Sequence, residues 1–180
     1  MLHLHIPSRE LWDEKNQQFL YTKAADIHLE HSLISISNWE MKWHVPYFDE
    51  EKTDEQAIDY VKCMTVERNV DDAVYLGLTM DHINAINEYM MDPMTATTIF
   101  EIQKKESPSK KKITSELIYY WMIQFGIPFT CDKWHINRLI MLIRVCSEEN
   151  KPRKKRSTRE IAAEQRALNA ARRAKYKTKG

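Results

Sequence analysis

The first thirty residues have the character of β-strands, and over residues 2–6 apolar and polar side chains alternate as they do in a half-buried strand. In the segment 2–6 every second residue is leucine or isoleucine, and Pro7 ends the run. The segments 19–22 and 26–30 have the composition of two further short strands, joined by a turn. This pattern predicts a small three-stranded antiparallel meander over about residues 1–31.

From Leu33 onward the apolar spacing changes to that of amphipathic helices. It predicts one helix from Leu33 that ends before Pro46, because proline cannot continue a helix. A second helix follows Thr53, which can form a capping box with Gln56. A third helix begins at Thr79 and ends at the Asp-Pro pair of residues 92 and 93.

The segment 114–148 is the most apolar part of the chain. It predicts a helix that ends at Gly126 and a second helix, capped by Asp132, that runs from Trp134 to Cys146. The second helix is apolar around most of its circumference, so other helices or a partner must cover it. The predicted fold class is therefore mainly α: a helical domain built around this C-terminal helical hairpin, with the N-terminal β meander and a basic helical C-terminal arm.

Charge divides the chain unevenly. Residues 151–180 contain 12 Lys and Arg and two acids, a charge of +10, whereas the first 150 residues carry −9 and the whole chain +1. We therefore predict an acidic α-rich globular domain over 1–150 and a basic arm over 151–180, with the polar segment 101–113 as a linker or exposed loop. The arm has the alanines and the capping box of a helix but only a thin apolar stripe. It is either a solvated tail or a segment that docks on an acidic surface or on nucleic acid.

Composition excludes several classes of protein. Of 180 residues, 43% are hydrophobic and only 3 are glycine, which excludes low-complexity and collagen-like chains. No apolar run approaches the roughly 20 residues of a membrane-spanning helix, and the N-terminus lacks the pattern of a secretory signal. Three scattered cysteines are too few for a disulfide framework and favour a reducing cytosol.

Signatures of catalysis and metal binding are scarce. There is no glycine-rich phosphate loop, no nucleophile elbow and no His-Glu-x-x-His pair. Cys131 and His135 have metal-ligand spacing but lack a second spaced pair, and the acidic run 49–55 is interpreted as helix initiation. We predict a protein that is not an enzyme, with no catalytic residues, no cofactor and no metal site.

Several motifs together suggest a lineage. Over nearly its whole length the chain resembles a family of small proteins from tailed bacteriophages of siphovirus type, through the segments 29–43, 51–55, 114–122, 127–129, 133–139, 143–146 and 167–173. Within that group it is most similar to tail assembly chaperones. The resemblance implies a non-enzymatic role in the host cell cytoplasm, with phage tail proteins, the tape-measure protein above all, as partners.

A chaperone of a long amphipathic protein needs excess apolar surface to cover its partner and a charged segment to recruit another component. The expected apolar groove consists of Trp121, Trp134, Leu139 and Ile143. The expected electrostatic contact consists of Arg153, Lys154, Lys155, Arg156, Arg172, Arg173 and Lys175. The alternative is a virion structural protein, in a head–tail connector or baseplate, or a protein whose arm binds nucleic acid. Self-association is also left open, and no membrane contact is expected.

Overall fold

The structure is a computed structural model of the chain. It describes residues 1–13, 17–49, 51–98 and 112–150, together with residues 162, 165–167, 169, 172 and 173. The chain divides into two compact units, Met1–Glu148 and Glu149–Gly180. The predicted 101–113 linker and the capping box of the predicted arm helix lie almost wholly outside the described residues.

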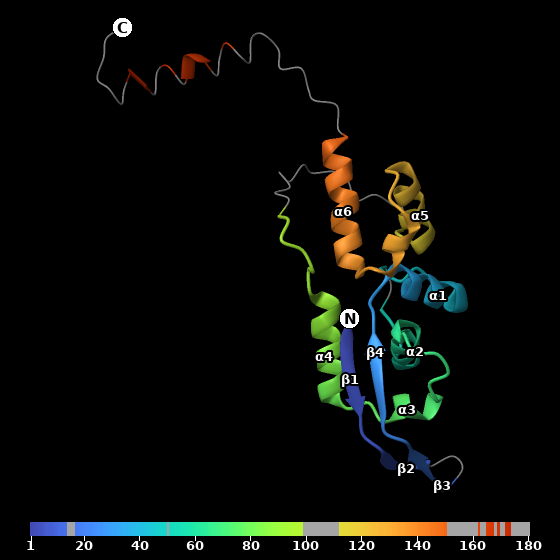
Figure 1. The fold of residues 1–180 in the computed structure, drawn as a ribbon. Coiled ribbons are helices and arrows are strands. Elements are labelled where there is room, and N and C mark those ends of the chain that lie inside the picture. The colour runs from blue at the N-terminus through green and yellow to red at the C-terminus, as the bar shows by residue number, and fades with distance from the viewer. Residues whose placement is uncertain are drawn as a thin grey trace. The chain divides into compact units, whose positions relative to one another are not determined.

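The N-terminal strands form two nested antiparallel pairs. They are β1 (Leu2–Ile6), β2 (Arg9–Asp13), β3 (Gln18–Thr22) and β4 (Ala25–Leu29). β1 pairs with β4 and β2 pairs with β3, so the two pairs follow each other along one interrupted hairpin (Figure 1).

The alternation predicted for the first strand is confirmed, whereas the predicted meander is wrong. Leu4 and Ile6 are buried, and Leu4 lies opposite the buried Ile27 of β4. A meander would place β1 beside the next strand, but its partner is the last one. The strand Arg9–Asp13 was not predicted because it is mostly polar and lacks a regular apolar alternation.

Helix α1 (Leu33–Trp43) begins where the change in apolar spacing predicts, and α2 (Asp54–Met64) begins after its predicted cap, Thr53. Thr53 and Gln56 form the expected capping box at the start of α2. Two tryptophans of α1 hold the helices together through their indole N–H groups. Trp39 donates to the carbonyl of Gln56 at 2.9 Å, and Trp43 donates to the carboxylate of the buried Asp59 at 2.8 Å.

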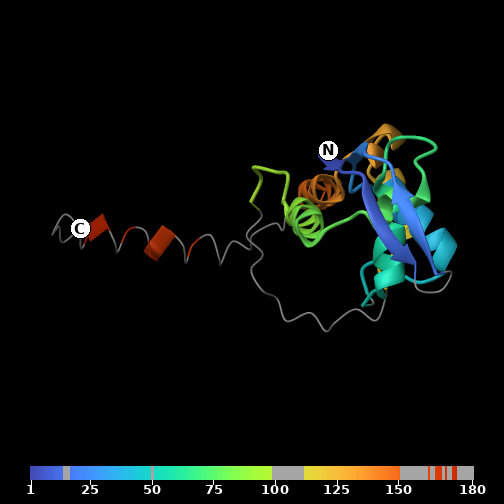
Figure 2. The same ribbon diagram turned by 90° about the horizontal axis from the view of Figure 1, so that it is seen from below.

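Helices α3 (Asp72–Leu76) and α4 (Met80–Met91) follow. α3 is one short turn that starts at the N-cap Asp71, and its length explains why periodicity did not predict it. α4 begins at Thr79 as predicted, through a capping box in which His82 takes the third position. α4 lies against β1 and α2 lies against β4, on opposite sides of the strand pair (Figures 1 and 2).

The last elements of the first unit are α5 (Ser115–Gln124), the 3-10 helix η1 (Phe129–Lys133) and α6 (Ile136–Glu149). Gly126 adopts the left-handed conformation, φ 65°, and ends α5 as predicted. The start of the second helix is corrected, because α6 begins two residues after Trp134. Asp132 does not cap it but lies in η1, where its carboxylate accepts a hydrogen bond from Tyr119 at 3.4 Å.

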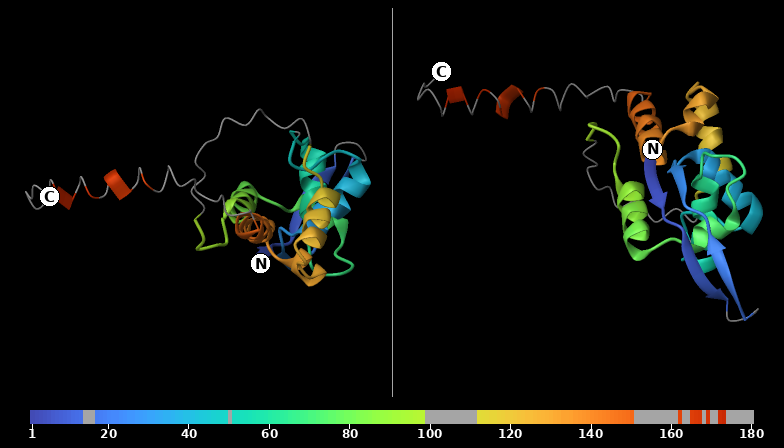
Figure 3. Two further views of the ribbon diagram at one scale, coloured as in Figure 1. Left: turned by 90° about the horizontal axis from the view of Figure 1, so that it is seen from above. Right: turned by 60° about the horizontal axis from the view of Figure 1, so that its bottom comes forward.

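The predicted fold class is wrong, because the chain is a mixed α/β protein and not a helical domain around a C-terminal hairpin. α5 packs on α1, while the start of α6 lies beside the end of α4 (Figure 3). The side chain of Asn137 in α6 donates there to the carbonyls of Met90 and Asp92, at 3.0 and 2.7 Å. When a helix is apolar on all sides, its sequence does not indicate which neighbouring element it packs against.

The core joins strands and helices. Ile6 and Leu29 from the strands and Trp39, Met122 and Leu139 from the helices are essentially fully buried. In the part of the chain that the structure describes, no helix combines the length and the apolarity required to cross a membrane.

Candidate functional site

An apolar pocket lies where the predicted hairpin opens between α5 and α6. Its position follows from how α5 is held. Thr114 caps the helix, its hydroxyl accepting from the backbone N–H of Leu117 at 3.4 Å. The N–H of Ser115 donates to the buried Glu40 of α1 at 2.7 Å. These contacts fix the N-terminal end of α5 against α1.

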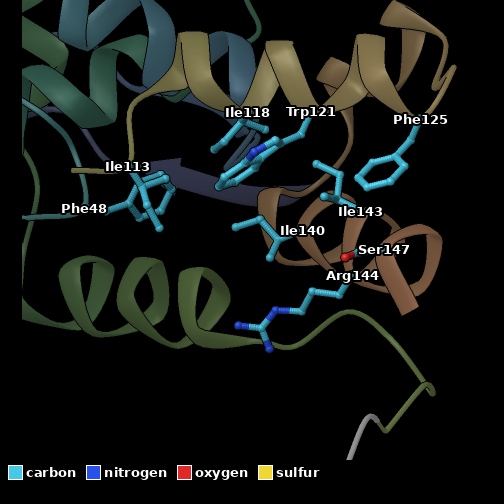
Figure 4. Close-up of a pocket in the computed structure, with 9 residues that line it drawn as sticks. All are labelled: Phe48, Ile113, Ile118, Trp121, Phe125, Ile140, Ile143, Arg144 and Ser147. Carbon is cyan, nitrogen blue, oxygen red and sulfur yellow. The ribbon is translucent and has the colours of Figure 1, made fainter. Parts of the chain in front are cut away.

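The pocket has a volume of about 500 Å³. It is lined by apolar side chains from α5 and α6, from the residues that flank α5 and from the loop after α1, with two polar residues on α6: Phe48, Ile113, Ile118, Trp121, Phe125, Ile140, Ile143, Arg144 and Ser147. Trp121 and Ile118 reach from α5 toward Ile140 of α6 (Figure 4). A cavity of this size and apolar character can take several apolar side chains of a partner.

Two of the four predicted groove residues, Trp121 and Ile143, line this pocket. Leu139 is fully buried in the core instead. Trp134 is half-buried before α6, with the guanidinium of Arg138 4.2 Å from its ring centre. The structure therefore brings Trp121 and Ile143 together in one pocket. The other two predicted groove residues, Leu139 and Trp134, pack elsewhere in the fold.

Sequence reasoning missed several pocket residues. Phe125 and Ile140 belong to the apolar pattern of the two helices, so periodicity could have included them. Phe48 lies in the loop after α1, and nothing in its local sequence places it beside residues almost a hundred positions later. Arg144 contributes the basic group at the pocket, which the sequence analysis assigned to the arm alone.

Most of the predicted electrostatic contact lies outside the described residues: Arg153, Lys154, Lys155, Arg156 and Lys175. Arg172 and Arg173 are described, and both are helical and exposed.

Two buried histidines form a cluster at the junction of β4, α2 and α6. His31 Nδ1 lies 2.5 Å from the hydroxyl of Tyr60, and the rings of His31 and His135 lie 5.2 Å apart. Burial, with the charges of His135 and Lys52, lowers the pKa of His31 to about 3, so its ring is neutral. With 4% and 6% of their surfaces exposed, both histidines are buried.

No group of three or more His, Cys, Asp or Glu side chains within the described ranges has an arrangement that could hold a metal ion. The histidines of the exposed strand face pair with acids. His5 Nδ1 lies 2.8 Å from the carboxylate of Asp26, and His28 Nδ1 lies 2.5 Å from that of Glu67.

Comparison of the chain with protein-family models, with curated proteins and with solved structures found no match.

Proposed function

We propose that this chain is a non-enzymatic binding protein that holds an apolar segment of another polypeptide between α5 and α6. The observation that carries the proposal is the pocket of about 500 Å³, in which seven of the nine lining side chains are apolar. An apolar helix of a partner that places two or three side chains there would bury surface otherwise left to water.

The resemblance to siphovirus tail assembly chaperones supplies the partner in this proposal, the tape-measure protein or another tail protein. A tape-measure protein is a long amphipathic helical chain, which aggregates when its apolar face is bare. The basic arm, 12 Lys and Arg against two acids, supplies a second contact in the proposal, with an acidic tail component. Such a protein acts in the host cytoplasm during assembly.

Co-expression tests the proposal. The full chain is expected to keep the tape-measure protein soluble, and Phe125→Ser is expected to abolish that effect because Phe125 lines the pocket. Ile123→Ser is the matched control, since Ile123 lies two residues before Phe125 at the end of α5 but is 61% exposed and outside the pocket. A Phe125→Ser variant that folds and still solubilises the partner as the unmodified chain does would contradict the pocket's role.

The charge of the arm favours a second candidate, a virion protein whose arm binds nucleic acid or an acidic ring of the particle. A gel shift with duplex DNA at two salt concentrations separates the two functions. A chaperone is expected to show little affinity, whereas phosphate binding by the arm would give a strong shift that salt removes. Presence of the chain in purified virions would favour the second candidate, and absence favours the chaperone.

A further inference from the structure

A second pocket, separate from the one between α5 and α6, lies among α2, α3 and α4. Its volume is about 400 Å³. The apolar part of its wall comes from all three helices, chiefly through Ile58, Val61, Leu76, Ile83, Ile86 and Met90. Cavities of this size, mostly apolar with a few polar groups, are typical of small-molecule sites.

The helix faces around this pocket are incompletely covered by the chain's described residues. Ile83, Ile86 and Met90 share the side of α4 that apolar spacing assigns to the core, yet Ile83 is 40% exposed. Ile58 of α2 is also 40% exposed, and Leu76 of α3 is 51% exposed. The rim of the pocket is therefore apolar surface that a bound apolar group would remove from water.

Among the described residues that line the pocket, Lys52 is the cationic one. Lys52 contributes to its lining, and its Nζ donates to the backbone carbonyl of Tyr47 at 2.7 Å. The ammonium also lies 3.8 Å from the centre of the Tyr47 ring and 5.4 Å from that of Trp39. Within the described ranges no carboxylate lies at ion-pair distance from Lys52, which leaves N–H donors for another acceptor.

The position of Lys52 carries an electrostatic cost. Burial lowers the pKa of its ammonium group, because a partly desolvated charge without a counter-ion is disfavoured. An anion bound beside Nζ would remove that cost. One lysine is a point charge that matches a single negative charge, whereas phosphate sites generally combine several donors with arginine or a helix N-terminus.

We propose that this pocket binds an amphipathic monocarboxylate, with the carboxylate on Lys52 Nζ and the apolar tail among the side chains of α2, α3 and α4. The site is independent of the polypeptide-binding function proposed above, because the two pockets share no residue. In this proposal Lys52 binds the carboxylate, and Ile58 and Ile83 at the rim contact the apolar tail where it enters the pocket.

Calorimetric titration of the full chain with dodecanoate, below its micellar concentration, tests the proposal. Dodecanol is the matched probe with the same tail and no charge. Lys52→Met is expected to weaken dodecanoate binding about tenfold or more and to leave dodecanol binding unchanged. Lys52→Arg is expected to retain dodecanoate binding because it keeps the positive charge.

Substitutions at the rim test the tail site independently of Lys52. Ile83→Asp is expected to abolish binding of both probes, because it places a carboxylate beside the tail. Met91→Asp is its control on the same helix, 81% exposed and outside the pocket. Dodecanoate binding that Lys52→Met leaves unchanged would overturn the proposal. So would binding that survives Ile83→Asp and disappears only with Phe125→Ser, since that result assigns the ligand to the other pocket.

Discussion

The carboxylate of Glu40, inside α1, accepts the backbone N–H of Ser115, the first residue of α5, at 2.7 Å. Its other oxygen accepts the backbone N–H of Tyr47 at 2.8 Å. Both donors are buried, and Glu40 itself is only 8% exposed. The Glu40 side chain thus provides a hydrogen-bond acceptor for the first N–H group of a helix that begins 75 residues later in the chain. It provides a second acceptor for an N–H group in the loop that follows its own helix.

Removing this carboxylate is expected to destabilise the protein. Glu40→Ala leaves two buried N–H groups without acceptors, and each such loss costs about 1–3 kcal/mol. We expect the free energy of unfolding to fall by about 2–6 kcal/mol, measured by urea denaturation. Glu88→Ala, at an exposed position in α4, is the control and should change stability by less than about 0.5 kcal/mol. A loss at Glu40 no larger than that at Glu88 would contradict the bridging role.

The sequence predicts the parts of this fold that depend on contacts between residues close together in the chain, and not those that depend on contacts between distant residues. The starts of α2 and α4 and the end of α5 were predicted correctly, because a cap such as Thr53 or a left-handed Gly126 acts within one helical turn. The pairing of β1 with β4 was not, since it depends on contacts between the two ends of the nested hairpin. The partner of Glu40 in α5, Ser115, lies 75 residues later in the chain and could not be known without the fold.

The residues of the candidate site were predicted only in part, because they too depend on contacts between distant parts of the chain. Trp121 and Ile143 were selected because they lie on two adjacent apolar helices, and both line the pocket. Leu139 was selected on the same ground and is core. A helix that is apolar on most sides does not distinguish a side chain that faces the core from one that faces an opening. The distinction depends on how α5 packs on α1 and on how the start of α6 is held beside the end of α4.

The buried histidines predict a dependence of stability on pH. The pKa of His31 is about 3 in the folded protein and about 6.5 when unfolded, so the unfolded chain binds more protons between these values. Stability is therefore fully present above about pH 6.5 and is lost as the pH falls. Between about pH 7.5 and pH 5.5 we expect His31 to lower the free energy of unfolding by roughly 1 kcal/mol.

The measurement is urea denaturation at the two pH values. His31→Gln is expected to reduce the difference between them, because glutamine has no proton to gain. The pKa of His135 is also lowered by burial, so a smaller difference should remain in that variant. His3→Gln, at an exposed strand position, serves as the control. Equal pH dependence in His31→Gln and the unmodified chain would show that this ring does not carry the effect.

Filling the pocket between α5 and α6 separates its role in binding from any role in folding. Ser147 lies on α6 and lines the pocket. Ser147→Phe adds an aromatic ring to an apolar cavity, and serine and phenylalanine have similar helix propensities. We therefore expect the free energy of unfolding to stay unchanged or to rise by up to about 2 kcal/mol, while solubilisation of the co-expressed partner is lost.

Asn150→Phe adds the same ring at an exposed position outside the pocket and should leave both quantities unchanged. A Ser147→Phe variant with full stability and full activity toward the partner would mean that the partner docks elsewhere on the chain.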